Sequence, residues 1–194
     1  MTWQGRQQMR GWLENQRLFW LLRRHRAAIV VVVLILVLLV TPPLSRRYGD
    51  RLQIALPLLG LGCSVLTGGT GEYLTRFVVM ETILQGTKRG LGDAPINVRP
   101  DGNLKGFPSG HSTAAAFGAS ALVHECLRAS PPVQAAVIIA AGFTGASRIA
   151  AERHDIWQVL AGILLGYLTE RLFRRRRRGF LRWIKAGVSR YVQK

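Results

Sequence analysis

The residues best suited to chemistry lie in two polar segments that border apolar runs. One segment holds Ser109, Gly110 and His111, and the other holds Arg148 and His154. A hydroxyl, a backbone N–H and a guanidinium can all donate to phosphate oxygens, and glycine lacks the Cβ that would block a close approach. Two histidines can then divide the work, because a neutral imidazole can attack phosphorus while a protonated one donates to the leaving oxygen. This combination predicts phosphoryl chemistry.

Further cations lie in or next to the Gly/Pro-rich segment 89–107. Arg99 can bind phosphate oxygens with two parallel hydrogen bonds, and either Lys88 or Arg89 can add a second positive charge. Cationic side chains can stabilise the transition state of phosphoryl transfer without a metal. The chain also has no metal-ligand spacing such as His-Glu-x-x-His. We therefore predict an enzyme with no metal and no cofactor.

Apolar runs separate these polar segments and must position them. Residues 27–40 contain no charged or polar side chain, and similar runs recur along the chain. Repeated runs of this kind are typical of a membrane protein. The sequence predicts an all-α polytopic fold, a bundle of six transmembrane helices at about 27–44, 52–67, 72–88, 111–127, 133–150 and 156–173.

The net charge of +17 is concentrated at the two ends of the chain. Six arginines lie within residues 1–26, and ten Lys or Arg residues lie within 171–194. Basic segments beside apolar spans bind anionic lipids on the cytoplasmic side, so we predict lipid partners here and no nucleic acid. We expect a basic interfacial segment at 1–26, a membrane domain at 27–173 and a basic amphipathic tail at 174–194, with interfacial helices at both termini.

The charge distribution also predicts an orientation. Six spans with cytoplasmic termini place the connection at 89–107 and the connection at 151–155 together on the outer side of a bacterial-type inner (plasma) membrane. These two connections and their borders carry the candidate site residues. The expected active site therefore faces the periplasmic or outer side. Arg46, Arg47 and Arg51, in the first connection, fall on the same side.

Three short motifs resemble the signature of the phosphatidic acid phosphatase type 2 superfamily, which reads Lys-x6-Arg-Pro, Pro-Ser-Gly-His and Ser-Arg-x5-His-x3-Asp. This chain has Arg99-Pro100, then Pro108-Ser109-Gly110-His111, then Ser147-Arg148 followed after five residues by His154. The resemblance implies a six-helix membrane phosphatase that forms a phosphohistidine intermediate. It implies that His154 is the nucleophile, that His111 is the general acid and base, and that the phosphate is held by Arg99, Ser109, Gly110 and Arg148.

The chain departs from that signature at two points. Ten residues separate Lys88 from Arg99 and nine separate Arg89 from it, where the signature has six, so either cation can serve the first motif. The residue four positions after His154 is Gln158 and not Asp. An amide oxygen can still accept from Nδ1–H of the imidazole, but it supplies no negative charge. We expect Gln158 to take the place of the orienting acid.

The predicted function is hydrolysis of a phosphomonoester or pyrophosphate on a lipid at the outer membrane face. Candidate substrates are phosphatidate, phosphatidylglycerol phosphate, a polyprenyl pyrophosphate and a lipid A phosphate. A lipid phosphotransferase with the same site and a catalytically silent membrane scaffold are the alternatives.

Cys63 and Cys126 lie in or beside apolar runs without a Cys-x-x-Cys motif, and we expect them to be buried free thiols.

Overall fold

The computed structural model describes residues 16–41 and 45–172, and within these ranges all regular secondary structure is helical. The predicted all-α fold is therefore confirmed for the described part of the chain. The helices match the six predicted apolar segments, with one short 3-10 helix between the third and fourth: α2 (Arg26–Val40), α3 (Ser45–Thr67), α4 (Thr70–Gly90), η1 (Pro95–Asn97), α5 (Gly110–Glu125), α6 (Pro131–Ala150) and α7 (Ile156–Arg171).

The predicted terminal segments are described only in part. Residues 16–24 are helical, and their side chains are exposed, with Arg23 and Arg24 placed over the rings of Phe19 and Trp20. The predicted tail at 174–194 lies outside the described residues, as do residues 1–15.

Helix α3 begins seven residues before the predicted start of the second span. The sequence predicts a connection around residues 45–51, whereas the structure has a helix there. The reason is a tertiary contact: this first stretch of α3 packs against the end of α6, where Gly49 comes so close to Ser147 and Arg148 that a Cβ would lie 2.0 Å from the Ser147 hydroxyl oxygen. Local polarity gives no sign of such a contact.

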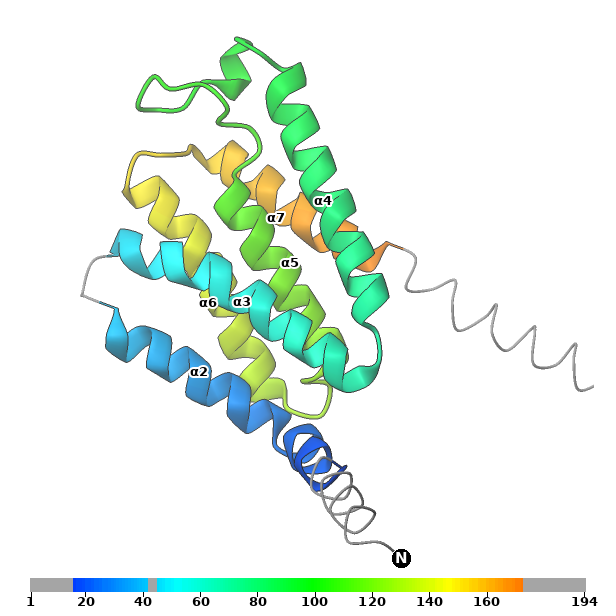
Figure 1. The fold of residues 1–194 in the computed structure, drawn as a ribbon. Coiled ribbons are helices and arrows are strands. Elements are labelled where there is room, and N and C mark those ends of the chain that lie inside the picture. The colour runs from blue at the N-terminus through cyan, green and yellow to red at the C-terminus, as the bar shows by residue number, and fades with distance from the viewer. Residues whose placement is uncertain (1–15, 42–44, 173–194) are drawn as a thin grey trace, which may run out of the picture.

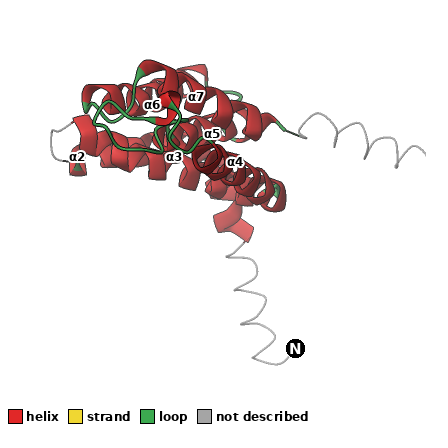
Figure 2. Ribbon diagram, turned by 90° about the horizontal axis from the view of Figure 1, so that it is seen from above, coloured by secondary structure: helices red, strands yellow, loops and turns green. Residues whose placement is uncertain are grey.

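Helix α5 lies at the centre of the bundle, between α3 on one side and α7 on the other (Figures 1 and 2). Glycines permit the helices to approach closely on both sides. A Cβ on Gly118 would lie 2.4 Å from the backbone of Leu56 and Pro57 in α3, and one on Gly166 of α7 would lie 2.2 Å from the carbonyl oxygen of Thr113. Small residues at helix crossings are characteristic of bundles whose stability comes from close van der Waals packing.

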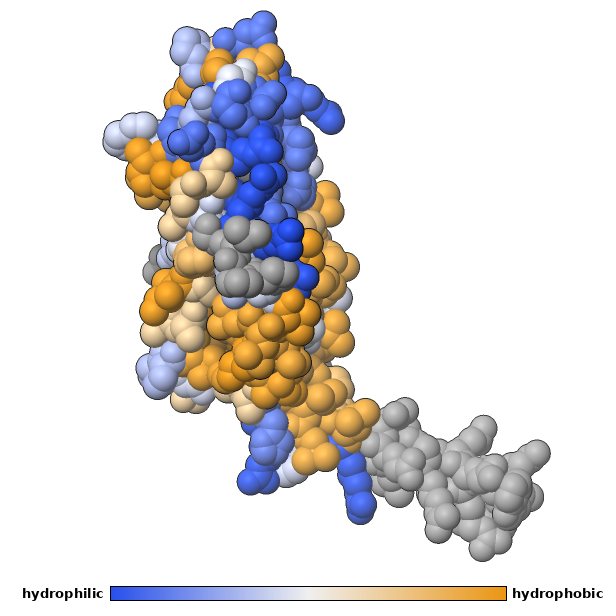
Figure 3. Space-filling model, turned by 90° about the vertical axis from the view of Figure 1, so that its left-hand side faces the viewer, coloured by the Kyte–Doolittle hydropathy of each residue, from blue (hydrophilic) through white to orange (hydrophobic). Residues whose placement is uncertain are grey.

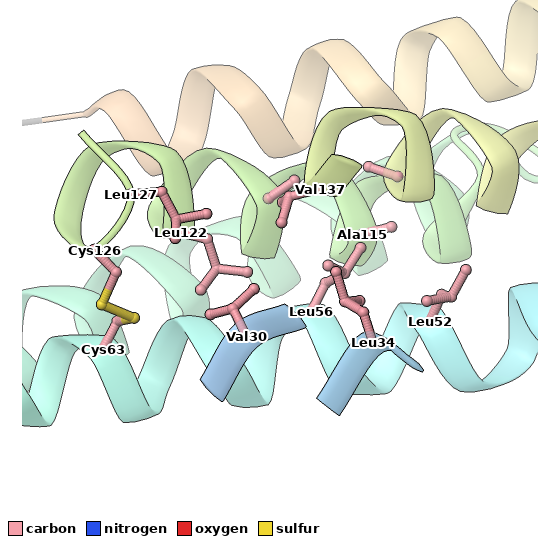
Figure 4. Packing of buried hydrophobic residues seen from close by; sticks show 12 residues of the cluster. Val30, Leu34, Leu52, Leu56, Cys63, Ala115, Leu122, Cys126, Leu127 and Val137 are labelled. Carbon is pink, nitrogen blue, oxygen red and sulfur yellow. A yellow bond between two sulfur atoms is a disulfide. The ribbon is translucent and has the colours of Figure 1, made fainter. Parts of the chain in front are cut away.

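Apolar side chains of α2, α3, α5 and α6 form the main core (Figure 4). Within it the structure joins Cys63 of α3 to Cys126, which follows α5, in a disulfide with a Cα–Cα distance of 5.9 Å. Both residues are buried as expected, but the expectation of free thiols was wrong. The close crossing of α3 and α5 brings together two sulfurs that lie 63 positions apart in the sequence, a proximity that no local motif records.

Helix α4 is joined to its neighbours by charged groups in the interior. Arg76 is buried and lies 3.3 Å from Glu125 of α5 and 3.9 Å from Glu170 of α7, and Glu72 lies 3.7 Å from it on its own helix. Ser120 donates to the second oxygen of Glu170 at 2.6 Å. Buried charges in proteins require such partners.

Much of the outer surface of the bundle is apolar. Large hydrophobic side chains are exposed on α2, α3, α4, α6 and α7, and Figure 3 shows a broad hydrophobic area below a hydrophilic end of the molecule. Of the described helices, α6 has by itself the length and apolar composition needed to cross a membrane, and α2 is apolar but shorter. The six membrane crossings therefore stay a prediction.

Two connections and the beginning of one helix come together at the hydrophilic end of the bundle. In Figure 1 the segment between α4 and α5 lies at the top, and the turn between α6 and α7 and the beginning of α3 lie below it on the left-hand side. An ion pair of 2.6 Å between Arg153 and Asp101 joins the first two. The fold thus brings together polar segments that are separated by up to about one hundred positions.

Candidate active site

The site is built around His154, a buried residue in the turn before α7. The next residue, Asp155, caps α7 by accepting the backbone N–H of Gln158 at 2.8 Å. This cap places the Gln158 side chain in the first turn of α7, where its amide oxygen lies 2.9 Å from Nδ1 of His154. Because His154, the capping residue Asp155 and the first turn of α7 follow one another in the chain, the imidazole is held next to the Gln158 amide.

The orientation of the Gln158 amide follows from its other bonds. Its nitrogen donates to the carbonyl oxygens of Ile96 at 3.1 Å and Val98 at 2.8 Å. The amide oxygen therefore faces His154 and can only accept, so Nδ1 must carry the proton. Nε2 of His154 is then the unprotonated nitrogen, which is the form that a nucleophile requires.

The same bonds explain why an amide suits this position. Gln158 is fully buried, and the segment between α4 and α5 folds so closely over it that a Cβ on Gly106 would lie 2.5 Å from the amide nitrogen. A carboxylate here could accept from His154 but could not donate to the two carbonyl groups. Gln158 thus both orients the histidine and fastens the neighbouring segment to α7.

The environment of His154 favours its neutral form. The pKa of His154 is lowered to about 4, mainly by burial and to a smaller extent by the nearby Arg99, Lys88 and His111, while the hydrogen bond that His154 donates to Gln158 opposes the shift. The imidazole is therefore uncharged at neutral pH.

Ser109 and His111 stand at the start of α5. Ser109 is fully buried, and its backbone N–H donates to the carbonyl oxygen of Gln158 at 2.9 Å, which ties the start of α5 to the start of α7. The hydroxyl of Ser112 donates to that of Ser109 at 3.1 Å. The Ser109 hydroxyl proton is then left to donate to another oxygen. Gly110 is the first residue of the helix, where backbone N–H groups have no partner within the helix.

Arg148 lies buried in the last turn of α6 and is held by three bonds. Its Nε donates to the Ser147 hydroxyl at 3.2 Å, one terminal nitrogen donates to Asp50 at 2.8 Å and the other donates to the carbonyl oxygen of Arg46 at 2.5 Å. The same Asp50 oxygen lies 3.0 Å from Nε2 of His111. Asp50 thus belongs to the site, although sequence reasoning missed it.

Lys88 and Arg99 converge on one carbonyl group, that of Lys105. Lys88 Nζ donates to this oxygen at 2.9 Å and Arg99 at 3.4 Å. Lys88 is buried at the end of α4, whereas the Arg89 side chain is exposed. Of the two cations that the sequence left open for the first motif, the structure brings Lys88 into the site.

Asn97 organises the segment that carries Arg99, and sequence reasoning missed it as well. It is fully buried; its amide nitrogen donates to the carbonyl oxygens of Lys88 and Gly92, and its amide oxygen accepts the backbone N–H of Phe107 at 3.1 Å. A buried amide that satisfies several backbone groups fixes the shape of an irregular segment. A lone Asn two residues after Pro95 gives no sequence signal that distinguishes it from an ordinary turn residue.

A search of curated proteins gives no match. Among solved structures, the chain is similar to a transmembrane PAP2-type phosphatidylglycerolphosphate phosphatase from Bacillus subtilis, with 22% sequence identity and a TM-score of 0.48. The alignment covers 79% of this chain and 91% of that one. The family model of the PAP2 superfamily matches residues 76–180, just over half of the chain and the part that carries His111 and His154. The protein therefore belongs to the PAP2 superfamily.

Proposed function

We propose that this chain is an integral membrane phosphatase that hydrolyses a phosphomonoester or pyrophosphate on a lipid through a phosphohistidine intermediate. The observation that carries the proposal is the state of His154. Its Nδ1 is engaged by Gln158, and the charges of Arg99, Lys88 and His111 act on it. A neutral imidazole with a free Nε2 and two cationic side chains, Arg99 and Lys88, suits attack on a phosphate dianion.

The first step transfers the phosphoryl group to His154. The lone pair of Nε2 forms a bond to phosphorus, and the bond between phosphorus and the leaving oxygen breaks. That oxygen takes a proton from His111, so the product is the lipid alcohol, or the lipid monophosphate when the substrate is a pyrophosphate. Nε2 now carries the phosphoryl group, while Nδ1–H remains bonded to Gln158.

The second step releases inorganic phosphate. His111, now neutral, takes a proton from a water molecule whose oxygen attacks phosphorus. The bond between phosphorus and Nε2 breaks, and its electron pair returns to the imidazole. His111 ends protonated and His154 ends neutral, so both residues return to their starting states.

The phosphate would be held by donors from four segments. Arg99 offers its Nε, a buried atom without a hydrogen-bond partner within the described residues. Buried donors in folded proteins are nearly always paired, so this one supports binding of an anion. The Ser109 hydroxyl, the Gly110 N–H, Lys88 and the remaining N–H groups of Arg148 complete the set.

Apolar side chains at the edge of the site support a lipid substrate. Ile96 and Leu104 lie on the segment between α4 and α5, and Ile156 and Trp157 open α7; all four are exposed, Trp157 to 69%. Exposed Trp and aliphatic groups at one end of an apolar surface are typical of a membrane interface. We propose that this end lies at the outer face of a bacterial-type inner (plasma) membrane, with six crossings and with both basic termini on anionic lipid in the cytoplasm.

Release of inorganic phosphate in detergent micelles tests this function. We expect the wild-type chain to hydrolyse lipid phosphates and the His154→Ala variant to give only the background rate. His25→Ala serves as the control, because His25 is exposed and lies away from the site near the beginning of α2. Equal rates for the wild type and His154→Ala would leave a silent membrane scaffold as the better interpretation.

The substrate is found by assaying phosphatidate, phosphatidylglycerol phosphate, a polyprenyl pyrophosphate and a lipid A phosphate side by side. A lipid-selective site predicts much faster turnover on one of them than on soluble phosphate esters. Adding a lipid or sugar alcohol to the same assay tests phosphotransfer, since a transferase forms a new phosphorylated product at the expense of inorganic phosphate.

A further inference from the structure

Asp50 connects two groups of the site through one oxygen atom. Its Oδ1 accepts from Nη1 of Arg148 at 2.8 Å and lies 3.0 Å from Nε2 of His111. The three residues come from α3, α6 and α5, so this contact brings together three helices. Asp50 also precedes residues 76–180, the part of the chain that matches the family model.

Arg148 holds the carboxylate in place. Its guanidinium is itself fixed by Ser147 and by the carbonyl oxygen of Arg46, and Gly49 packs directly against it. The start of α3 is therefore seated on the end of α6, with Asp50 aimed at His111. The Asp50 side chain remains 44% exposed. Arg148, by contrast, is buried, so the carboxylate also neutralises a buried charge, and a test of its role in the reaction must separate this structural effect from an effect on His111.

The two histidines have different partners, and the difference matches their tasks. His154 is paired with a neutral amide, which adds no negative charge to oppose the lowering of its pKa by burial, and a nucleophile must be uncharged. His111 is paired with a carboxylate, and a negative charge beside an imidazole stabilises the positive charge that a general acid carries. Since Nε2 of His111 faces Asp50, the proton for the leaving oxygen would come from Nδ1.

We propose that Asp50 is a positioning residue for the acid–base step: held by Arg148, its carboxylate orients His111 and stabilises the charged ring. This inference rests on the proposed function. Asp50 touches neither the phosphate nor the nucleophile in this scheme, and it acts on the reaction through His111. The third signature motif has an acid beside the nucleophilic histidine, where this chain has Gln158. In this chain the acid is Asp50, which comes from another helix and contacts the other histidine, His111.

The dependence of the reaction on its leaving group tests this role. The assay measures kcat/KM in detergent micelles for two substrates. One is an alkyl phosphate, and the other is a nitrophenyl phosphate whose ring carries the same alkyl chain. An alkoxide needs a proton to leave and a nitrophenolate does not. We expect Asp50→Asn to lower kcat/KM for the alkyl phosphate by about tenfold or more and for the nitrophenyl phosphate by less than about threefold.

Two more variants complete the test. Asp93→Asn removes the same charge from an exposed position in the segment after α4 and should leave both rates unchanged. Asp50→Glu keeps the carboxylate and should retain more activity on the alkyl phosphate than Asp50→Asn does. Thermal unfolding in detergent establishes that each variant is folded.

The possible failures are distinguishable. Equal losses on the two substrates, or no loss on either, would overturn the role of Asp50 while the proposed function stands. If the Asn variant does not fold, the Glu variant decides: unequal losses on the two substrates support the role, and equal losses overturn it. A wild-type chain with no activity on any lipid phosphate would overturn the proposed function and this inference together.

Discussion

The side-chain amide of Gln158 joins two parts of the site: its oxygen lies 2.9 Å from Nδ1 of His154, and its nitrogen donates to Ile96 and Val98 in the segment that carries Arg99. One group therefore sets the protonation of the proposed nucleophile and the position of the segment that carries Arg99. An acid at the same place could perform the first task but not the second.

Replacement of Gln158 by Glu should therefore damage the enzyme, although it restores an acid. The change keeps the size of the side chain and removes its two donors, which leaves two buried carbonyl groups unpaired and places a charge beside them. We expect a loss of about 2–4 kcal/mol in the free energy of unfolding and a fall of at least about tenfold in kcat/KM. Denaturant unfolding in detergent and phosphate release measure the two effects. A variant that is as stable as the wild type and more active would contradict this account of the amide.

The acid limit of the reaction should reflect the lowered pKa of His154. Burial lowers that pKa to about 4, so the imidazole should stay neutral from pH 7 down to that value and take up its proton only below it. The nucleophile is thus available above about pH 4 and is lost as the pH falls through that value. Nitrogen-15 NMR of the histidine rings in micelles follows this titration directly, with His154→Ala identifying the signal. A midpoint at or above the ordinary value for histidine, about 6.5, would be incompatible with the buried, neutral state.

The stability of the fold should also depend on this group. Between about pH 6.5 and pH 4 the unfolded chain binds a proton at His154 that the folded chain does not, so the free energy of unfolding falls as the pH falls through this range. The His154→Ala variant should show a weaker dependence over the same range. Thermal unfolding of both proteins at several pH values measures the difference, and parallel curves would argue against a depressed pKa.

Lys88 and Arg89 form a matched pair for testing the first motif. Both are cations at the end of α4, but Lys88 is buried and shares the Lys105 carbonyl with Arg99, while Arg89 is exposed. We expect Lys88→Gln to lower kcat/KM about a hundredfold, because it removes a charge near the developing transition state. Arg89→Gln should keep kcat/KM close to that of the wild type. The reverse order of effects would assign the motif to Arg89.

Removal of divalent metals should leave the activity unchanged. In the proposed scheme, the positive charges that stabilise the phosphoryl group in the transition state come from Lys88, Arg99 and Arg148. Dialysis against EDTA followed by the phosphate-release assay checks this, with magnesium or zinc added back in parallel samples. Vanadate, which adopts the five-coordinate geometry of the transition state, should inhibit the treated enzyme as well as the untreated one. Activity that disappears with EDTA and returns with one metal would refute a purely cationic site.

The helices could be predicted because apolar runs and the Gly/Pro-rich breaks between them are local features. The spacing between Arg148 and His154 and the run from Pro108 to His111 are local too, and they led to the correct family. Asp50 was missed because its importance comes from helix packing: it lies 61 positions from His111 and 98 from Arg148. The pairing of Cys63 with Cys126 was missed for the same reason.

Gln158 shows a second limit of sequence reasoning. Its place four residues after His154 identified it as a partner of that histidine, and the hydrogen bond between them follows from helical geometry. Its two other partners are backbone carbonyl groups about 60 positions away. The types of side chain can be read from a sequence. The direction of a distant backbone carbonyl group cannot, because it depends on the fold of the whole segment.

The closeness of Gly106 to Gln158 has a consequence for the reaction cycle. The segment between α4 and α5 rests on the amide that also keeps Nδ1 of His154 protonated. A movement of this segment away from α7 would break the bonds of that amide to Ile96 and Val98, and the amide would be free to turn its nitrogen toward the histidine. In the proposed scheme, His154 can attack only while this segment is closed over Gln158. The chemistry would then be confined to the closed state of the site.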